Sequence, residues 1–135
     1  MKKCDICIVG AGTAGMAAAY ALMGSNYKVI IVEKSSNPGG TAVNAWVETW
    51  IPGINPPFLK EILKKDFHYT DETLENTVLP EKFARKGKEG RSVYLSSKEL
   101  CNIYLRDIGQ SSNMELLCNY ELHDVRIENR KVKKI

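Results

Sequence analysis

The first residues that could do chemistry are a run of glycines near the amino terminus, where residues 10–15 read GAGTAG and match the pattern G-x-G-x-x-G. In such a loop the first glycine permits a tight turn, the second lets a phosphate approach the main chain, and the third lets the next helix pack closely. The start of that helix offers free N–H groups and a partial positive charge, which attract an anion. The residues expected to hold a diphosphate are Gly10, Gly12, Thr13, Ala14 and Gly15.

An acidic residue follows at the spacing expected for a carboxylate that binds a sugar. Glu33 lies about 20 residues beyond the glycine loop. A carboxylate at that place accepts hydrogen bonds from ribose hydroxyls and repels a 2′-phosphate, which argues against an NADP-type ligand. The neighbouring Lys34 would soften this repulsion, but we expect its side chain to point into solvent.

A βαβ unit is needed to bring these residues together. Residues 4–9 (CDICIV) and 28–32 (KVIIV) are short and almost continuously apolar, which predicts parallel strands buried on both faces. Thr13 to Met23 is rich in Ala, Met and Leu and is followed by Gly24, which predicts a helix between the strands. With a right-handed crossover, residues 4–33 form one such unit.

Two further segments follow the βαβ unit. Residues 38–92 are expected to form a loop and helical insertion, with a short helical turn at 45–49 and a helix at 57–67. Residues 96–135 are expected to form a helix, a third strand at 114–118 and an antiparallel hairpin. The helix is predicted from Ser96 or Ser97 to Ile108, and the hairpin strands over residues 122–127 and 131–135.

The stretch after Glu33 separates flavin binding from nicotinamide binding. It reads E-x5-G-G-T and ends in Gly39, Gly40 and Thr41. Together with the glycine loop, this pattern resembles the large superfamily of FAD-dependent oxidoreductases with glutathione-reductase-like flavin domains. The resemblance implies FAD as the cofactor, with the acid on its ribose and the glycine pair against the flavin nucleotide. Lys34 and Thr41 flank these positions and are included as candidate cofactor contacts.

The resemblance also implies a fold and a longer protein. The expected class is α/β, a Rossmann-like FAD/NAD(P)-binding three-layer fold with a parallel sheet. Residues 114–135 are similar to the third strand and the start of an antiparallel β-meander, with the main chain around Leu122 near the adenine. A later Gly-Asp segment and a substrate domain are implied beyond them. We therefore expect this chain to be the N-terminal portion of an FAD-binding domain, truncated from a longer enzyme and without activity on its own.

Thiol and metal chemistry are not expected. Ala42 and Val47 stand where disulfide-reducing relatives read G-G-T-C-x4-C. Cys4 and Cys7 form a C-x-x-C pair, but no second pair of ligands follows at zinc spacing. We expect both to be buried structural cysteines in the first strand.

No catalytic acid or base can be named from the sequence. His68 and His123 stand alone and are expected to be surface or packing residues. No His or Cys lies between Glu33 and His68, so a covalent flavin link is not indicated. Trp46 and Trp50 are expected to pack in an apolar interior, with a flavin or substrate pocket as the alternative.

Composition limits the class of protein. The 135 residues are one domain's worth, 44% hydrophobic and 26% charged. A net charge of +3 is too small to argue for nucleic acid or a membrane surface. Asp5 interrupts the early apolar run, which argues against a signal peptide, and the expected location is the cytoplasm.

The expected partners are FAD and, in the longer enzyme, an unidentified small-molecule substrate. With strand order 3-2-1, the strand at residues 4–9 lies at an edge of the sheet, where unpaired main-chain groups invite self-association. Two alternative functions stay open. One is an NAD-binding dehydrogenase domain, which gives Gly39 and Gly40 no role, and the other is a non-catalytic nucleotide-binding module.

Overall fold

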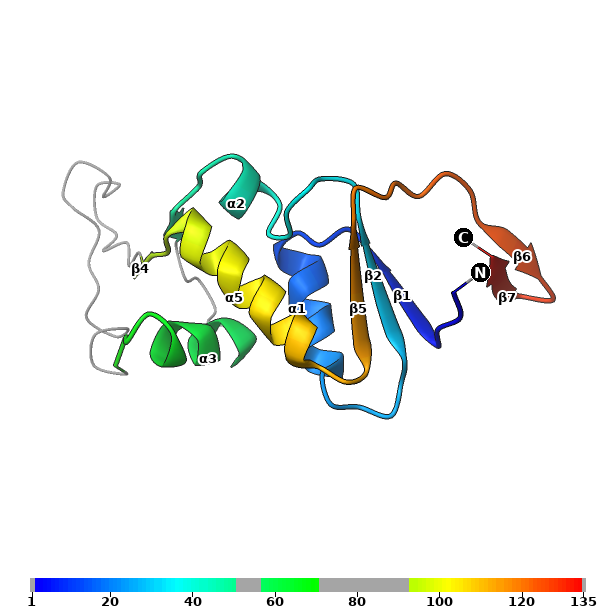
Figure 1. Ribbon diagram of the computed structural model, residues 1–135, viewed down its shortest axis with the longest axis horizontal. Coiled ribbons are helices and arrows are strands. Elements are labelled where there is room, and N and C mark those ends of the chain that lie inside the picture. Colours follow the sequence, from blue (N-terminus) through cyan, green and yellow to red (C-terminus); the bar gives the residue numbers. More distant parts are fainter. Residues whose placement is uncertain (1, 51–56, 71–92, 135) are drawn as a thin grey trace, which may run out of the picture.

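The computed structural model describes residues 2–50, 57–70 and 93–134 (Figure 1). The elements are β1 (Ile6–Val9), α1 (Thr13–Leu22), β2 (Val29–Glu33), α2 (Thr41–Asn44), β3 (Thr49–Trp50), α3 (Pro57–Lys65), β4 (Val93–Tyr94), α5 (Ser97–Gln110), β5 (Met114–Cys118), β6 (Arg126–Glu128) and β7 (Lys131–Lys134). The described residues contain no helix long and apolar enough to cross a membrane.

A parallel sheet with strand order β1-β2-β5 forms the centre of the structure. Ile6 pairs with Val29, and Val29 pairs in turn with Met114, so β2 lies between its two neighbours. This order confirms the expected 3-2-1 arrangement and leaves β1 at an edge of the described sheet. Because β1 has one neighbour among the described strands, its residues are only half-buried and Val9 is 53% exposed, whereas residues 29–31 of β2 are buried as expected.

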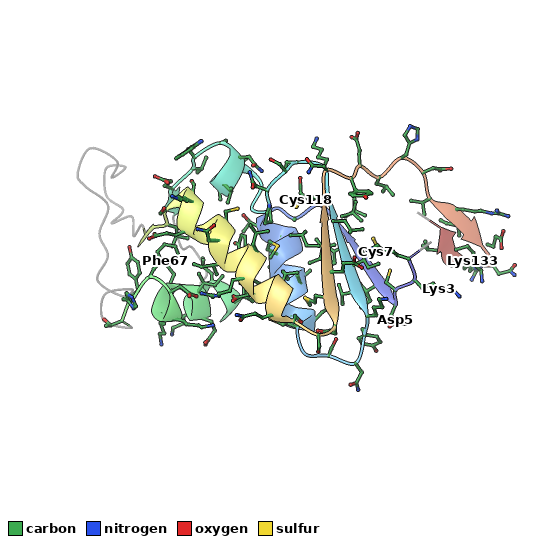
Figure 2. All side chains as sticks on the ribbon, viewed as in Figure 1. Lys3, Asp5, Cys7, Phe67, Cys118 and Lys133 are labelled. Atoms are coloured by element: carbon green, nitrogen blue, oxygen red, sulfur yellow. The ribbon has the colours of Figure 1, made fainter. Side chains whose placement is uncertain are left out.

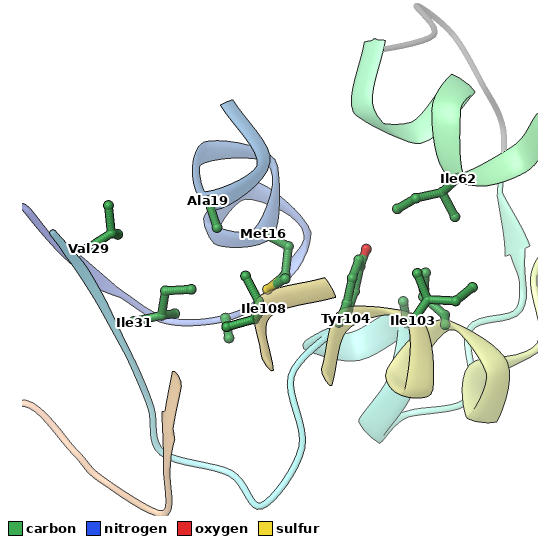
Figure 3. Close-up of a cluster of buried hydrophobic side chains, with 11 residues drawn as sticks. Met16, Ala19, Val29, Ile31, Ile62, Ile103, Tyr104 and Ile108 are labelled. Carbon is green, nitrogen blue, oxygen red and sulfur yellow. The ribbon is translucent and has the colours of Figure 1, made fainter. Parts of the chain in front are cut away.

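The core lies between the sheet and the helices on one of its faces. In Figure 1 the sheet stands edge-on, with α1 and α5 on one side and the β6–β7 hairpin on the other. Figure 3 shows Met16 of α1, Ile31 of β2 and Ile108 of α5 converging in this core. α3 packs on α1 and adds Ile62 to the same cluster. This is a Rossmann-like α/β arrangement followed by a small antiparallel sheet, as expected.

The segment after Gly40 differs from the prediction. The helical turn lies at Thr41–Asn44 instead of residues 45–49. Trp46 has a φ of 55°, which is outside the helical region and ends the helix there. Thr49–Trp50 then pairs with Val93–Tyr94 as a two-stranded antiparallel sheet. Of the predicted insertion at 38–92, residues 51–56 and 71–92 lie outside the described part of the chain.

The other boundaries shift by smaller amounts. α5 begins after Ser96, whose hydroxyl accepts a hydrogen bond from the Glu99 amide at 3.4 Å, and it extends to Gln110, beyond the predicted end at Ile108. β6 begins at Arg126, so the predicted hairpin strand at 122–127 was too long. The first part of that segment instead follows the carboxyl ends of the parallel strands.

The cysteine prediction was only partly right. Cys4 is exposed and precedes β1, while Cys7 is half-buried within it. The strand starts later than predicted because Asp5 folds back, its carboxylate accepting a hydrogen bond from the Lys28 amide at 2.8 Å. Cys7 and Cys118 lie on different strands (Figure 2), and all the cysteines are free thiols.

Candidate functional site

The glycine loop joins the end of β1 to the start of α1 at the carboxyl edge of the sheet. Gly10 has a φ of 92°, which a side chain would disfavour, and its amide donates to the Val32 carbonyl at 2.7 Å. Gly12 is the N-cap of α1 and supplies no side-chain cap, and the first turn contains no acidic residue. The amides of this turn are therefore available to an anion, and Thr13 and Ala14 are exposed beside them.

Gly15 is required by close packing. A Cβ built at this position would collide with the Gly10 carbonyl oxygen and lie 3.4 Å from the Ile8 side chain. The helix therefore presses against the preceding loop as well as the strand. The expected close packing is present, with the loop carbonyl as the nearest contact.

A second glycine turn meets the first. The Gly39 amide donates to the Ala11 carbonyl at 2.6 Å, which ties the turn before α2 to the glycine loop. A Cβ on Gly12 would lie 3.9 Å from the Gly40 Cα, and a Cβ on Gly40 would lie 3.0 Å from the Gly12 Cα, so the main chains of the two glycines are in direct contact. We call Gly12 and Gly40 the glycine cradle. It presents bare main chain at the start of α1, which suits a group as bulky and charged as a diphosphate.

Glu33 points to the glycine loop, but much of its carboxylate is already engaged. The residue is 7% exposed, and Oε2 accepts a hydrogen bond from the Ala11 amide at 2.7 Å. Oε1 accepts from the Ser35 amide at 2.8 Å and from the Ser35 hydroxyl at 2.6 Å. A carboxylate offers about four acceptor positions, so Oε2 keeps one for an incoming donor.

The same contacts determine the ionisation of Glu33. Burial is the largest influence and by itself raises the pKa of this carboxyl. The Ser35 hydroxyl, the Ser35 and Ala11 amides and the charge of Lys34 outweigh burial together, so the pKa lies below its ordinary value. Glu33 is thus anionic at neutral pH. Lys34 itself is exposed, as expected.

A cavity of about 350 Å³ opens beside Glu33 at the carboxyl ends of the strands. It is lined by Val9, Gly10, Val32, Glu33, Lys34, Tyr120, Glu121 and Leu122. The Tyr120 amide donates to the Glu33 carbonyl at 3.0 Å, and the Asn119 amide donates to the Ser35 carbonyl at 3.0 Å. These bonds bring the segment after β5 over the end of β2, and Leu122 is part of the cavity lining.

Tyr120 and Glu121 were not predicted as site residues. Tyr120 is 60% exposed and lies beside the cavity mouth. Their position directly after the third strand was the available signal, because the carboxyl ends of parallel strands meet at one edge of a sheet.

A larger cavity, of about 480 Å³, lies at the opposite end of α1 and α5. Asp107 there accepts a hydrogen bond from the Tyr20 hydroxyl at 2.6 Å, and Asp66 pairs with Arg106 at 2.7 Å. Glu61 adds a further carboxylate to this lining. The cavity lies at the end of α1 away from the glycine cradle, and among its described lining residues three carboxylates outnumber one cation, Lys65, which disfavours a diphosphate.

The remaining candidates provide no obvious catalyst. His68 and His123 are exposed, as expected for surface residues. Within the described residues, no group of His, Cys, Asp and Glu side chains could hold a metal ion. Trp46 is 74% exposed, so the prediction that it packs in the interior was wrong. The structure does not describe the Trp50 side chain.

The chain matches a known protein family and parts of several known enzymes. The family model described as FAD dependent oxidoreductase matches residues 5–135. A 4-oxocyclohex-2-ene-1-carboxylate 5-dehydrogenase from Sinomonas cyclohexanicum is 42% identical over 50 residues, which is 37% of this chain and 8% of that enzyme. The chain thus spans a small part of the curated relatives that it matches.

Two solved structures share the fold. THI4 from Thermovibrio ammonificans superposes with a TM-score of 0.57 at 20% identity, over 96% of this chain and 45% of that one. The pqsL protein from Pseudomonas aeruginosa superposes with a TM-score of 0.55 at 16% identity, over 94% of this chain and 36% of that one.

Proposed function

Because the chain belongs to the FAD-dependent oxidoreductase family, whose cofactor is FAD, we propose that its glycine loop and Glu33 bind the ADP half of FAD. The observation that carries the proposal is the hydrogen bond from the Ala11 amide to Glu33 Oε2 at 2.7 Å. It holds Glu33 against the glycine loop at one edge of the sheet, which supports a shared ligand. The proposed contacts are Gly10, Gly12, Thr13, Ala14, Gly15, Glu33, Lys34, Gly39, Gly40 and Thr41.

The diphosphate is proposed to bind at the glycine cradle and the start of α1. The first-turn amides of α1 have no side-chain cap, and no acidic side chain in that turn competes for them. Gly12 and Gly40 have no side chains, and a Cβ on Gly40 would lie 4.0 Å from the Thr13 amide nitrogen, so both glycines leave main chain bare beside that turn. An anion at this point gains hydrogen bonds from the amides and the favourable end of the helix dipole.

The adenosine is proposed to occupy the cavity between Glu33 and Leu122. The unused acceptor position of Glu33 suits one ribose hydroxyl, which would donate to it. Because Glu33 is anionic, a 2′-phosphate in the same place would be repelled, and this favours FAD over an NADP-type ligand. Val9 and Leu122 supply apolar walls for a flat base.

In the whole enzyme, the bound flavin supplies hydride and electron transfer. The residues of this chain would bind the cofactor and orient it. We assign residues 4–33, 38–92 and 96–135 to successive parts of one FAD-binding domain. The match to the Sinomonas enzyme covers 8% of its length, so we place substrate selection outside these residues and expect no turnover from this chain alone.

The direct test is a substitution that fills the glycine cradle without disturbing the fold. In Gly12→Ala the new methyl would lie 3.9 Å from the Gly40 Cα, an ordinary contact, so the protein should fold normally. The methyl would cover bare main chain at the start of α1, beside the proposed diphosphate site, and we expect the affinity for both ADP and FAD to fall at least about tenfold. Isothermal titration calorimetry with each ligand measures this change.

The matched control is Gly109→Ala on α5, where an added Cβ meets nothing within 4 Å. It should leave both affinities unchanged. If Gly12→Ala binds ADP and FAD as tightly as the unaltered chain, the cradle does not hold the diphosphate and the proposal fails.

We also propose that the β1 edge permits self-association. Among the described residues β1 pairs with β2 alone, and Val9 is 53% exposed beside the free edge. Light scattering coupled to gel filtration, over a range of protein concentrations, should show a mass that rises with concentration. A constant monomer mass would contradict this.

A further inference from the structure

Trp46 is unusual in two respects. Its side chain is 74% exposed, although tryptophan is among the residues that gain most from burial. Its φ of 55° puts a bulky side chain in the left-handed region, which costs roughly 1–2 kcal/mol. A residue that is both strained and exposed adds little to the stability of the fold, and strained residues of this kind cluster at functional sites.

The surrounding chain fixes this conformation from both sides. The amides on either side of it, Ala45 and Val47, donate to the Thr41 carbonyl at 3.1 and 3.4 Å. After it, the Glu48 carboxylate accepts a hydrogen bond from the Ser97 amide at 2.8 Å, at the start of α5. The turn at Trp46 is therefore held between α2 and α5 and is not a loose loop.

The position of this turn relative to the glycine cradle identifies what it can reach. Gly40, one half of the cradle, is the N-cap of α2, and Trp46 follows the other end of the helix. α2 has four residues, so it spans about 6 Å. Asn44 near its end donates to the Ser35 hydroxyl at 3.2 Å, which keeps α2 close to the loop after β2.

From this placement we infer that the Trp46 indole, with Val47 beside it, contacts the isoalloxazine ring of the FAD whose diphosphate sits in the cradle. The inference rests on the proposed function. The isoalloxazine is joined to the diphosphate by a short ribityl chain, so it must lie close to the cradle. It is a flat, electron-poor ring, and an exposed indole offers it an apolar, electron-rich face. Val47 is 48% exposed and extends the apolar surface.

Ligand affinity separates this inference from the proposed function. Trp46→Leu keeps an apolar side chain and removes the aromatic face. We expect its affinity for FAD to fall about tenfold, the size of a stacking contact, while its affinity for ADP stays unchanged. Equal affinities of Trp46→Leu and the unaltered chain for FAD, or an equal loss for ADP and FAD, would overturn the inference. Failure of the unaltered chain to bind either ligand would overturn the proposed function as well.

Tryptophan fluorescence gives an independent reading. The chain has two tryptophans, so the fluorescence of the Trp50→Phe protein comes from Trp46 alone. The Trp46→Phe protein, whose fluorescence comes from Trp50 alone, is the matched control. Added FAD absorbs the same share of the exciting light in both samples. FAD should quench the Trp50→Phe protein more strongly than the control, and ADP should quench neither. Equal quenching of the two proteins by FAD would overturn the inference.

A third variant distinguishes binding from folding. Glycine adopts positive φ readily, so Trp46→Gly should keep or raise the melting temperature while losing the same FAD affinity as Trp46→Leu. A marked fall in melting temperature would show that Trp46 serves the fold, which would overturn the inference.

Discussion

Two regions that follow the parallel strands differ sharply in how they are held. At the carboxyl edge of the sheet Glu33 is 7% exposed and accepts three hydrogen bonds from Ala11 and Ser35. In the β6–β7 hairpin Ile127 and Val132 are 63% and 61% exposed. An ion pair joins the Arg126 and Glu128 side chains at 2.6 Å, but such exposed pairs contribute little.

The difference shows where the stability of this chain arises. The site edge rests on a core shared by the sheet and the helices, so its polar groups are oriented by buried neighbours. β6 and β7 pair with each other, but their side chains are exposed among the described residues, and a hairpin on its own is only marginally stable. We therefore expect binding geometry to depend on the first region and to be insensitive to the second.

The largest effect should be the difference in stability loss between two Ile→Ala substitutions, one made in each region. Ile31→Ala removes a fully buried side chain and should lower the free energy of unfolding by about 3–4 kcal/mol. Ile127→Ala, at a residue 63% exposed, should change it by less than about 0.5 kcal/mol. Urea denaturation followed by circular dichroism measures both. A loss at Ile127 as large as at Ile31 would show that the hairpin is packed in solution, and the comparison would break.

Gly15→Ala should have the next largest effect. Its methyl would collide with the Gly10 carbonyl oxygen, a backbone atom that cannot move without distorting the loop. We expect a loss of about 3 kcal/mol in the free energy of unfolding, together with weaker ADP binding. Gly109→Ala adds the same methyl in open space on α5 and should not destabilise the protein. Normal stability of Gly15→Ala would mean that the loop is looser than it appears.

Glu33 links stability to pH. Its pKa is lower in the folded chain than the ordinary 4.5, so its contribution is fully present above about pH 4.5 and is lost as the pH falls through the folded value. Glu33→Gln should cost about 2 kcal/mol at neutral pH, because one amide loses its acceptor. It should also flatten the acid side of the stability curve. Thermal melts from pH 7 down to about pH 3 test both, and an unchanged acid slope would exclude Glu33 as its source.

The smallest effect concerns the core behind the site. The Tyr104 hydroxyl is buried and has no hydrogen-bond partner among the described residues, and burial raises the pKa of this phenol. Tyr104→Phe should therefore stabilise the protein by up to about 1 kcal/mol. Tyr20→Phe, which removes a 2.6 Å hydrogen bond to Asp107, should instead destabilise it by about 1 kcal/mol. A destabilised Tyr104→Phe would reveal a partner for that hydroxyl, such as an internal water.

Local patterns predicted much of the fold. Residues 114–118 were predicted as a strand and are β5, and the helix expected from Thr13 to Met23 is α1 with a slightly earlier end. Such segments follow from apolar periodicity and from glycine or serine at their ends. The prediction of a turn at residues 45–49 was wrong, because the helix starts at Thr41 and the positive φ of Trp46 ends it. The sequence has no glycine at this position to mark the end of the helix.

By itself the sequence determined the order of the βαβ unit, the glycine loop and the place of Glu33 at a strand end. These depend on residue type and spacing along the chain. Only the tertiary structure decided that the Gly39 amide closes on Ala11, that Glu33 keeps one free acceptor position, and that Trp46 faces solvent beyond α2. Each of these depends on contacts between segments far apart in the chain, which become fixed once the core brings those segments together.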